Sequence, residues 1–154
     1  MTQSARTRPP PAPPASVRAL LEHTGLRDIL QLVGGEDGID RPIDHPRIQK
    51  SGLVLAGHTH GIVPTRVQIL GETEVSFLET LEPAVRRERA DGFFALSLSC
   101  VIVTRGVQPA SELVESAERT GTPLLVSSVR SSATIAALHG ALDRLLAPAS
   151  SATA

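Results

Sequence analysis

Lysine, aromatic residues and cysteine are scarce in this sequence of 154 residues, and each scarcity argues against a class of function. The three aromatic residues, all phenylalanines, offer few surfaces on which bases could stack. Fifteen basic residues face 16 acidic ones, so the net charge of −1 gives no reason to expect nucleic acid or an acidic membrane as a partner. The single cysteine, Cys100, cannot form an internal disulfide and is typical of the reducing cytoplasm.

Long hydrophobic runs are also missing. No stretch approaches the roughly 18 apolar residues of a membrane-spanning helix. The basic residues near the N-terminus are not followed by the apolar segment of a secretory signal. These absences favour a cytoplasmic protein.

The composition that remains is that of one globular domain, with 41% hydrophobic and 20% charged residues. Residues 1–15 are rich in proline, and residues 149–154 carry no large apolar side chain. Neither stretch has enough apolar surface to offset the entropy of ordering, so we expect both to be disordered tails. The folded domain is predicted to span residues 16–148.

The first half of the chain predicts short elements separated by loops. These are a helix over 17–25 with Ser16 as its N-cap, a strand over 29–33, a loop over 36–50 that could hold a short strand, one or two helical turns over 51–57, a strand over 66–70, and a helix from Glu72 with a break or second helix at Pro83. The charges at Arg86–Arg89 are expected to form a solvated helix face.

The second half alternates buried strands with helices. Residues 100–104 and 123–128 are continuous apolar runs, typical of strands buried on both faces. Between them, Pro109 is expected to open a helix that runs through Ala117 and is ended by Gly121, and a final helix covers 135–145. Parallel strands joined by a helix cross over right-handedly, so the fold class is α/β, a three-layer α/β sandwich with a mainly parallel sheet.

No nucleotide-binding motif is present. A P-loop requires G-x-x-x-x-G-K-[ST], but the only lysine, Lys50, follows Gln49 where the second glycine must stand. There is no G-x-G-x-x-G either, and the glycines at 34–38 are typical of turns. The sequence therefore predicts no cofactor.

Motifs for other chemistry are weak. His58 and His60 alternate and could hold a metal ion with His45 as a third ligand, which would suit a metal enzyme or hydrolase. The alternative is that they are polar loop residues between Gly57 and Gly61, and we favour it. No G-x-S-x-G nucleophile elbow occurs, and Cys100, at the start of an apolar strand, is expected to be an inert buried thiol.

A ligand crevice is the better candidate site. In open α/β sheets, ligands bind beyond the carboxyl ends of the strands, near helix N-termini. The residues predicted there carry hydroxyls and two guanidinium groups, which suit a small anion or a sugar-like ligand: Thr104, Arg105, Gly106, Ser127, Ser128 and Arg130. The competing interpretation is ordinary loop and capping chemistry, with Arg105 paired to a surface acid.

Several short motifs, in order, resemble one known family. They are Gly52-Leu53, Leu55-Ala56-Gly57, Arg66–Gly71, Glu74, Phe77-Leu78, Cys100–Gly106, Pro123-Leu124-Leu125 and Leu145–Pro148. Together they are similar to the N-terminal domain of HPr kinase/phosphorylase, and the resemblance spans about residues 17–148. That enzyme phosphorylates and dephosphorylates a serine of HPr, the phosphocarrier of the bacterial sugar phosphotransferase system.

The resemblance implies an α/β domain similar to the N-terminal domains of Mur ligases, joined in the family to a C-terminal kinase domain that carries the P-loop. The linkage to that domain begins near Ala147-Pro148, and this chain stops six residues later, so no catalytic residue is carried over. The family commonly has aromatic residues where His58-Thr59-His60 stands, which puts any contact that depends on them in doubt.

Our first hypothesis is a non-catalytic regulatory or assembly domain. Its partner would be a separately encoded HPr kinase catalytic domain or a phosphotransferase-system protein, and it could form a homo-oligomer. The alternative under this hypothesis is that the chain is a natural or engineered fragment of a longer one. The second is a stand-alone sensor of a small anion or sugar phosphate.

Overall fold

The structure is a computed structural model, and it describes residues 13–55, 57–58, 60–106 and 108–147. Most of the predicted N-terminal tail, and the predicted tail over 149–154 with Pro148, lie outside these ranges. Next to the predicted boundary at residue 16, Ala15 is fully buried and its carbonyl accepts the N–H of Ile43 at 2.9 Å. The folded domain therefore includes at least Ala15.

A five-stranded sheet, in the order β1-β5-β4-β3-β2, forms the centre of the described structure. Its strands are β1 (Leu30–Gly34), β2 (Gln49–Lys50), β3 (Gln68–Leu70), β4 (Val101–Val103) and β5 (Leu124–Ser127). Strands β2 to β5 run parallel, and β1 pairs antiparallel with β5. The predicted mainly parallel sheet is confirmed.

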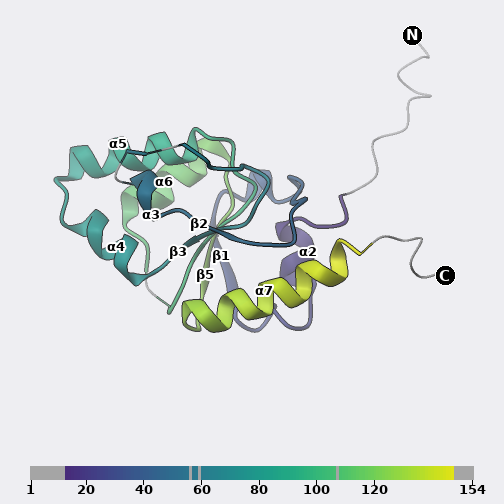
Figure 1. The fold of residues 1–154 in the computed structure, drawn as a ribbon. Helices are drawn as coiled ribbons and strands as arrows, with labels where there is room; N and C mark the ends of the chain where they lie inside the picture. Colours follow the sequence, from purple (N-terminus) through teal and green to yellow (C-terminus); the bar gives the residue numbers. More distant parts are fainter. Residues whose placement is uncertain (1–12, 56, 59, 107, 148–154) are drawn as a thin grey trace, which may run out of the picture.

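Helices cover both faces of this sheet (Figure 1). They are α2 (Val17–Glu22), α3 (Gly52–Leu55), α4 (Glu72–Glu79), α5 (Pro83–Phe94), α6 (Ser111–Thr120) and α7 (Ser131–Leu145), with a 3₁₀ turn η1 at Glu36–Gly38. Helices α3 to α6 lie on one side of the sheet, whereas α2 and α7 lie on the other. The predicted three-layer α/β sandwich is confirmed.

The central strand β4 shows how the sequence divides its side chains between the layers. Successive residues of a strand point to opposite faces. Ile102 packs with the α2 and α7 layer, whereas Val101 and Val103 pack with α4, α5 and α6. All three side chains are fully buried, which explains the continuous apolar run.

Local signals set the helix ends. The Ser16 hydroxyl accepts the N–H of Ala19 and caps α2, Pro83 occupies the first turn of α5, and Gly121 ends α6 in the left-handed region with φ of 66°. These three predictions are confirmed. Helix α6 begins at Ser111, two residues after the predicted start at Pro109.

The prediction that the charges at Arg86–Arg89 form a solvated helix face is wrong in part. Arg86 is only 19% exposed, and its guanidinium donates to the carbonyls of Leu78 and Leu81 at 2.9 and 3.0 Å, at and beyond the end of α4. Arg86 also pairs with Glu112 of α6 at 3.3 Å. It therefore joins three helices, which charge patterning along the sequence cannot reveal.

No helix in the described ranges is long and apolar enough to cross a bilayer.

Candidate functional site

The carboxyl ends of the four parallel strands lie along one edge of the sheet. Strand β2 ends at Lys50, β3 leads through Gly71 into α4, and β5 leads through a short loop into α7. The loop after β4 is tied to the loop after β5, because Arg105 N–H donates to the carbonyl of Val129 at 2.8 Å. The N-termini of α4 and α7 thus open onto this edge.

Three cations line one cleft of about 380 Å³ there: Lys50 at the end of β2, and Arg105 and Arg130 in the loops after β4 and β5. Arg105 has a positive φ of 66°, which turns the chain sharply out of the sheet. Its guanidinium lies 3.7 Å from the carboxylate of Glu72, and the two side chains are 58% and 61% exposed. An ion pair this exposed is weak, so the arginine remains available to an incoming anion.

The helix ends add partial positive charge to this cleft, and Glu72 and Glu74 in the first turn of α4 offset part of it. Neither α4, which begins after Gly71, nor α7, which begins after Arg130, receives a hydrogen bond from an N-cap side chain. First-turn N–H groups carry partial positive charge. The Glu74 carboxylate already accepts the N–H of Gly71, which commits one of its oxygens to the backbone.

Five of the six residues predicted for the crevice fall into two groups. Thr104 and Ser127 are fully buried, and their hydroxyls bond to Ser131 at 2.6 Å and Thr134 at 2.8 Å. These two hydroxyls hold the first turn of α7 and do not face the cleft. The structure does bring Arg105 and Arg130 together, and Ser128 shares a second hollow with them.

Gly106 completes the turn after Arg105. It also has a φ of 66°, and its N–H donates to the carbonyl of Ser127 at 2.6 Å. Glycine adopts this backbone conformation without strain. Its role here is to shape the loop that carries Arg105.

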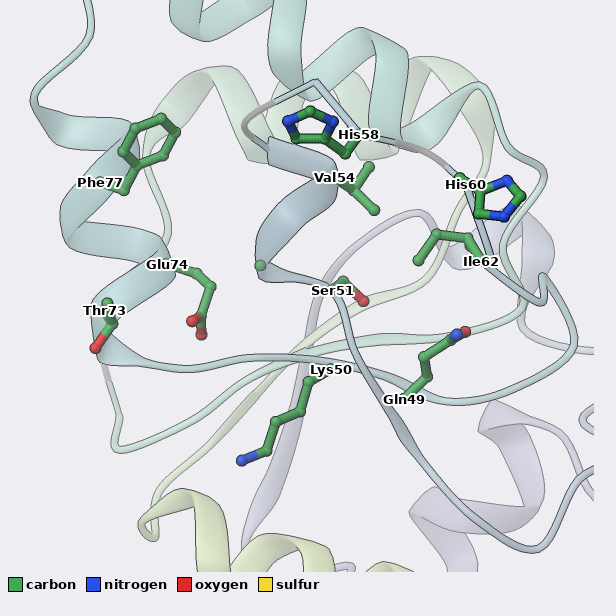
Figure 2. A pocket seen from close by; sticks show the side chains of 11 residues that line it. Gln49, Lys50, Ser51, Val54, His58, His60, Ile62, Thr73, Glu74 and Phe77 are labelled. Carbon is green, nitrogen blue, oxygen red and sulfur yellow. The ribbon is translucent and has the colours of Figure 1, made fainter.

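A larger cavity, of about 590 Å³, adjoins this cleft and was not predicted from the sequence. Figure 2 shows α4 with Phe77 on one side of it, α3 with Val54 behind it, and Ile62 on the other side. Lys50, Thr73 and Glu74 line both this cavity and the cationic cleft. The two hollows are therefore contiguous.

The predicted alternative of a metal ion held by His45, His58 and His60 is not supported. His58 and His60 both line the larger cavity, but Figure 2 shows their imidazole rings well apart. In the part of the chain that the structure describes, no three His, Cys, Asp or Glu side chains gather closely enough to hold a metal ion. His45 instead lies 3.6 Å from the carboxylate of Asp44.

Two other titratable groups have perturbed pKa values. Burial raises the pKa of the Cys100 thiol, so this side chain is not activated as a nucleophile, which agrees with the prediction of an inert thiol. Partial burial lowers the pKa of His139 below its usual value, and the charge of Arg47 lowers it further, against a smaller opposing effect of Asp143. The His139 Nε2 accepts the N–H of Ile48 at 3.3 Å, which requires the neutral ring.

Comparison with known proteins covers nearly all the described structure. The family described as the HPr Serine kinase N terminus matches residues 15–142. HPr kinase/phosphorylase from Geobacter sulfurreducens is 37% identical over 133 residues, which are 86% of this chain and 42% of that protein. The enzyme of the same name from Bacillus cytotoxicus is 37% identical over 119 residues, 77% of this chain and 38% of that protein.

The chain thus spans about two fifths of the length of these relatives. Among solved structures, the CBS and DRTGG domains of the regulatory region of Clostridium perfringens pyrophosphatase, complexed with the activator diadenosine tetraphosphate, align with a TM-score of 0.54. That alignment covers 88% of this chain and 52% of the other at 14% identity, so it supports the fold alone. From the family match and the sequence identity to its curated relatives, this chain belongs to the HPr serine kinase N-terminal domain family.

Proposed function

We propose that this chain is a non-catalytic regulatory or assembly domain that acts in the serine phosphorylation of HPr and so in the control of carbohydrate metabolism. Its membership of the HPr serine kinase N-terminal family carries this proposal. Phosphoryl transfer would be performed by a P-loop domain outside these 154 residues. The partners would be that kinase domain or a phosphotransferase-system protein, and self-association is a further way in which the domain could support assembly.

The surroundings of the only lysine support a non-catalytic role. Strand β2 ends at Lys50 and α3 begins at Gly52, so a single residue, Ser51, separates strand from helix. A P-loop needs a glycine-rich turn between strand and helix, whose N–H groups surround the phosphates. No such turn fits between β2 and α3.

The test is a phosphorylation assay with purified HPr and ATP. We expect no transfer to HPr by this chain alone, and transfer by a full-length HPr kinase/phosphorylase as the positive control. The second half of the assay adds this chain to a separately produced P-loop kinase domain and measures both co-elution and rate. Transfer by the chain alone would overturn the non-catalytic assignment. The regulatory assignment would be overturned if the chain did not co-elute with the kinase domain and did not change its rate.

A second candidate function, sensing of a small anion or sugar phosphate, is favoured by the cleft. Lys50, Arg105 and Arg130 converge there beside two helix N-termini. A guanidinium can bind phosphate through two parallel hydrogen bonds, and an open ion pair with Glu72 does not prevent this.

A thermal-shift screen with inorganic phosphate, sugar phosphates and nucleotides tests this function. We expect at least one anion to raise the melting temperature, and we expect Arg105→Ala and Arg130→Ala to reduce that shift. Arg87→Ala is the matched control, because Arg87 pairs with Glu115 between α5 and α6 and does not line the cleft. An anion that stabilises all four proteins equally would remove the cleft as its site.

A further inference from the structure

We propose that the ligand of this domain is a small aromatic anion, whose ring occupies the cavity between α3 and α4 and whose charged group lies in the adjoining cationic cleft. The anionic half of this inference rests on the sensing function proposed above. The ring half rests on a different observation, the apolar cavity beside Phe77.

Phe77 is the observation that points to a ring. It is 36% exposed, and it is the large hydrophobic side chain that remains exposed in the described part of the chain. Val75 and Leu78 of the same helix are buried in the core, so Phe77 lies off the face by which α4 packs. An exposed phenyl ring that borders a hollow offers a flat surface for stacking.

The cavity has the size and lining of a small-molecule site. Its volume of about 590 Å³ lies within the usual range of roughly 300–1,000 Å³ for ligand pockets. Val54 and Ile62 supply further apolar surface, and His58 and His60 add two flat polar rings at its border. A few polar groups within a mainly apolar lining fix the orientation of a ligand.

Lys50 connects the two hollows. Figure 2 shows that its side chain starts at the edge of the cavity and extends away from Phe77, toward the α7 side, where the cationic cleft lies. Thr73 and Glu74 also line both spaces. The Glu74 carboxylate keeps its charge but is bonded to Gly71 N–H at the start of α4, so the negative group of a ligand would lie beyond it, beside Arg105 and Arg130.

A ligand that fills both hollows would gain binding free energy from each of them. Inorganic phosphate or a sugar phosphate could satisfy Arg105 and Arg130 but would leave the apolar surface of Phe77 and Val54 in contact with water. An aromatic ring joined to a phosphate would cover that surface as well. We therefore expect an aromatic phosphate to bind about tenfold or more tightly than inorganic phosphate.

The experiment compares 1-naphthyl phosphate, inorganic phosphate and uncharged 1-naphthol by isothermal titration calorimetry. Wild type should bind 1-naphthyl phosphate most tightly of the three. Phe77→Ala should remove its advantage over inorganic phosphate and leave phosphate affinity unchanged, whereas Phe77→Tyr, which keeps the ring, should retain the advantage. Arg130→Ala should weaken both anions. Because Phe77 is partly exposed, these variants should fold, which their melting curves verify.

The possible outcomes test the ring site and the anion site separately. If inorganic phosphate binds in an Arg130-dependent manner but 1-naphthyl phosphate binds no better, or if Phe77→Ala keeps the advantage, the ring site is refuted and the anion site stands. If 1-naphthol binds as tightly as 1-naphthyl phosphate, the anion is not part of the ligand. If none of the three binds, both this inference and the sensing function fail.

Discussion

Gly35 allows a stringent test of the packing between β1 and β5. It has a φ of 73°, and a Cβ built on it would lie 1.7 Å from the carbonyl oxygen of Thr122 and 2.9 Å from the nitrogen of Pro123. Real Cβ atoms do not approach other atoms closer than about 3.0 Å, so Gly35→Ala must separate the two backbone segments by more than an ångström. The atoms that the Cβ would meet all belong to the backbone, so no flexible side chain can move aside.

Gly106 is the matched control, because its φ of 66° is similar but a Cβ there meets no described atom within 4 Å. Both alanine variants incur the left-handed backbone penalty, about 1–2 kcal/mol. Only Gly35→Ala adds the overpacking cost, typically about 1–3 kcal/mol. For a domain of this size, 1 kcal/mol corresponds to roughly 4 °C in melting temperature.

Thermal unfolding followed by circular dichroism provides the assay. We expect a decrease of roughly 4–8 °C for Gly106→Ala and of roughly 8–20 °C for Gly35→Ala. Equal decreases for the two variants would show that the close approach of Gly35 to Thr122 does not exist in solution. The comparison depends on the difference between variants, so the absolute stability of the wild type does not enter.

Three further predictions concern charge and burial. Val103→Asp should abolish the cooperative thermal transition, because Val103 is fully buried and an unpaired carboxylate costs several kcal/mol against a total stability of about 5–15; a normal melt would contradict the placement of β4 at the sheet centre. Arg86→Ala should destabilise the domain by about 1.5–3 kcal/mol in urea unfolding through its lost carbonyl contacts, whereas the exposed Arg87→Ala should cost under about 1 kcal/mol; similar values would refute the joining role of Arg86. Since the folded-state pKa of His139 is lowered, its contribution to stability is complete above about pH 6.5 and is lost as the pH falls below that value. His139→Gln should therefore flatten the decline in melting temperature over this acidic range. An unchanged decline would exclude His139 as its cause.

Much of the fold could be predicted because the signals were local. The apolar runs around Val103 and Leu125 predicted buried strands, and the helix between them fixed their parallel pairing. Caps such as Ser16 and Gly121 depend on neighbouring residues alone. The direction of β1 could not be predicted in this way, because its antiparallel pairing with β5 joins Leu30 to Ser127 and leaves no trace in the sequence near either.

The candidate site was predicted only in part, for the same reason. The rule that ligands bind beyond strand ends led to Arg105 and Arg130, but it could not distinguish hydroxyls that face the cleft from those, like Thr104, that bond to α7. Lys50 was considered only as a P-loop lysine. Phe77 carried a usable signal, since the three-residue separation of Val75 and Leu78 places those two on one face of α4 and leaves Phe77 off it.

The pairing of the first strand with the last has a consequence for folding during synthesis. Strand β1 is made early, yet its only neighbour in the described sheet, β5, ends at Ser127. The buried residues Val17 and Leu20 of α2 belong to the same core cluster as Leu138 of α7, so this cluster stays incomplete until α7 is made. A nascent chain that has emerged only as far as α6 therefore exposes these apolar residues, and such exposure favours aggregation and chaperone binding. We expect ribosome-stalled chains to acquire protease resistance abruptly once α7 leaves the exit tunnel, and not in steps as each strand appears.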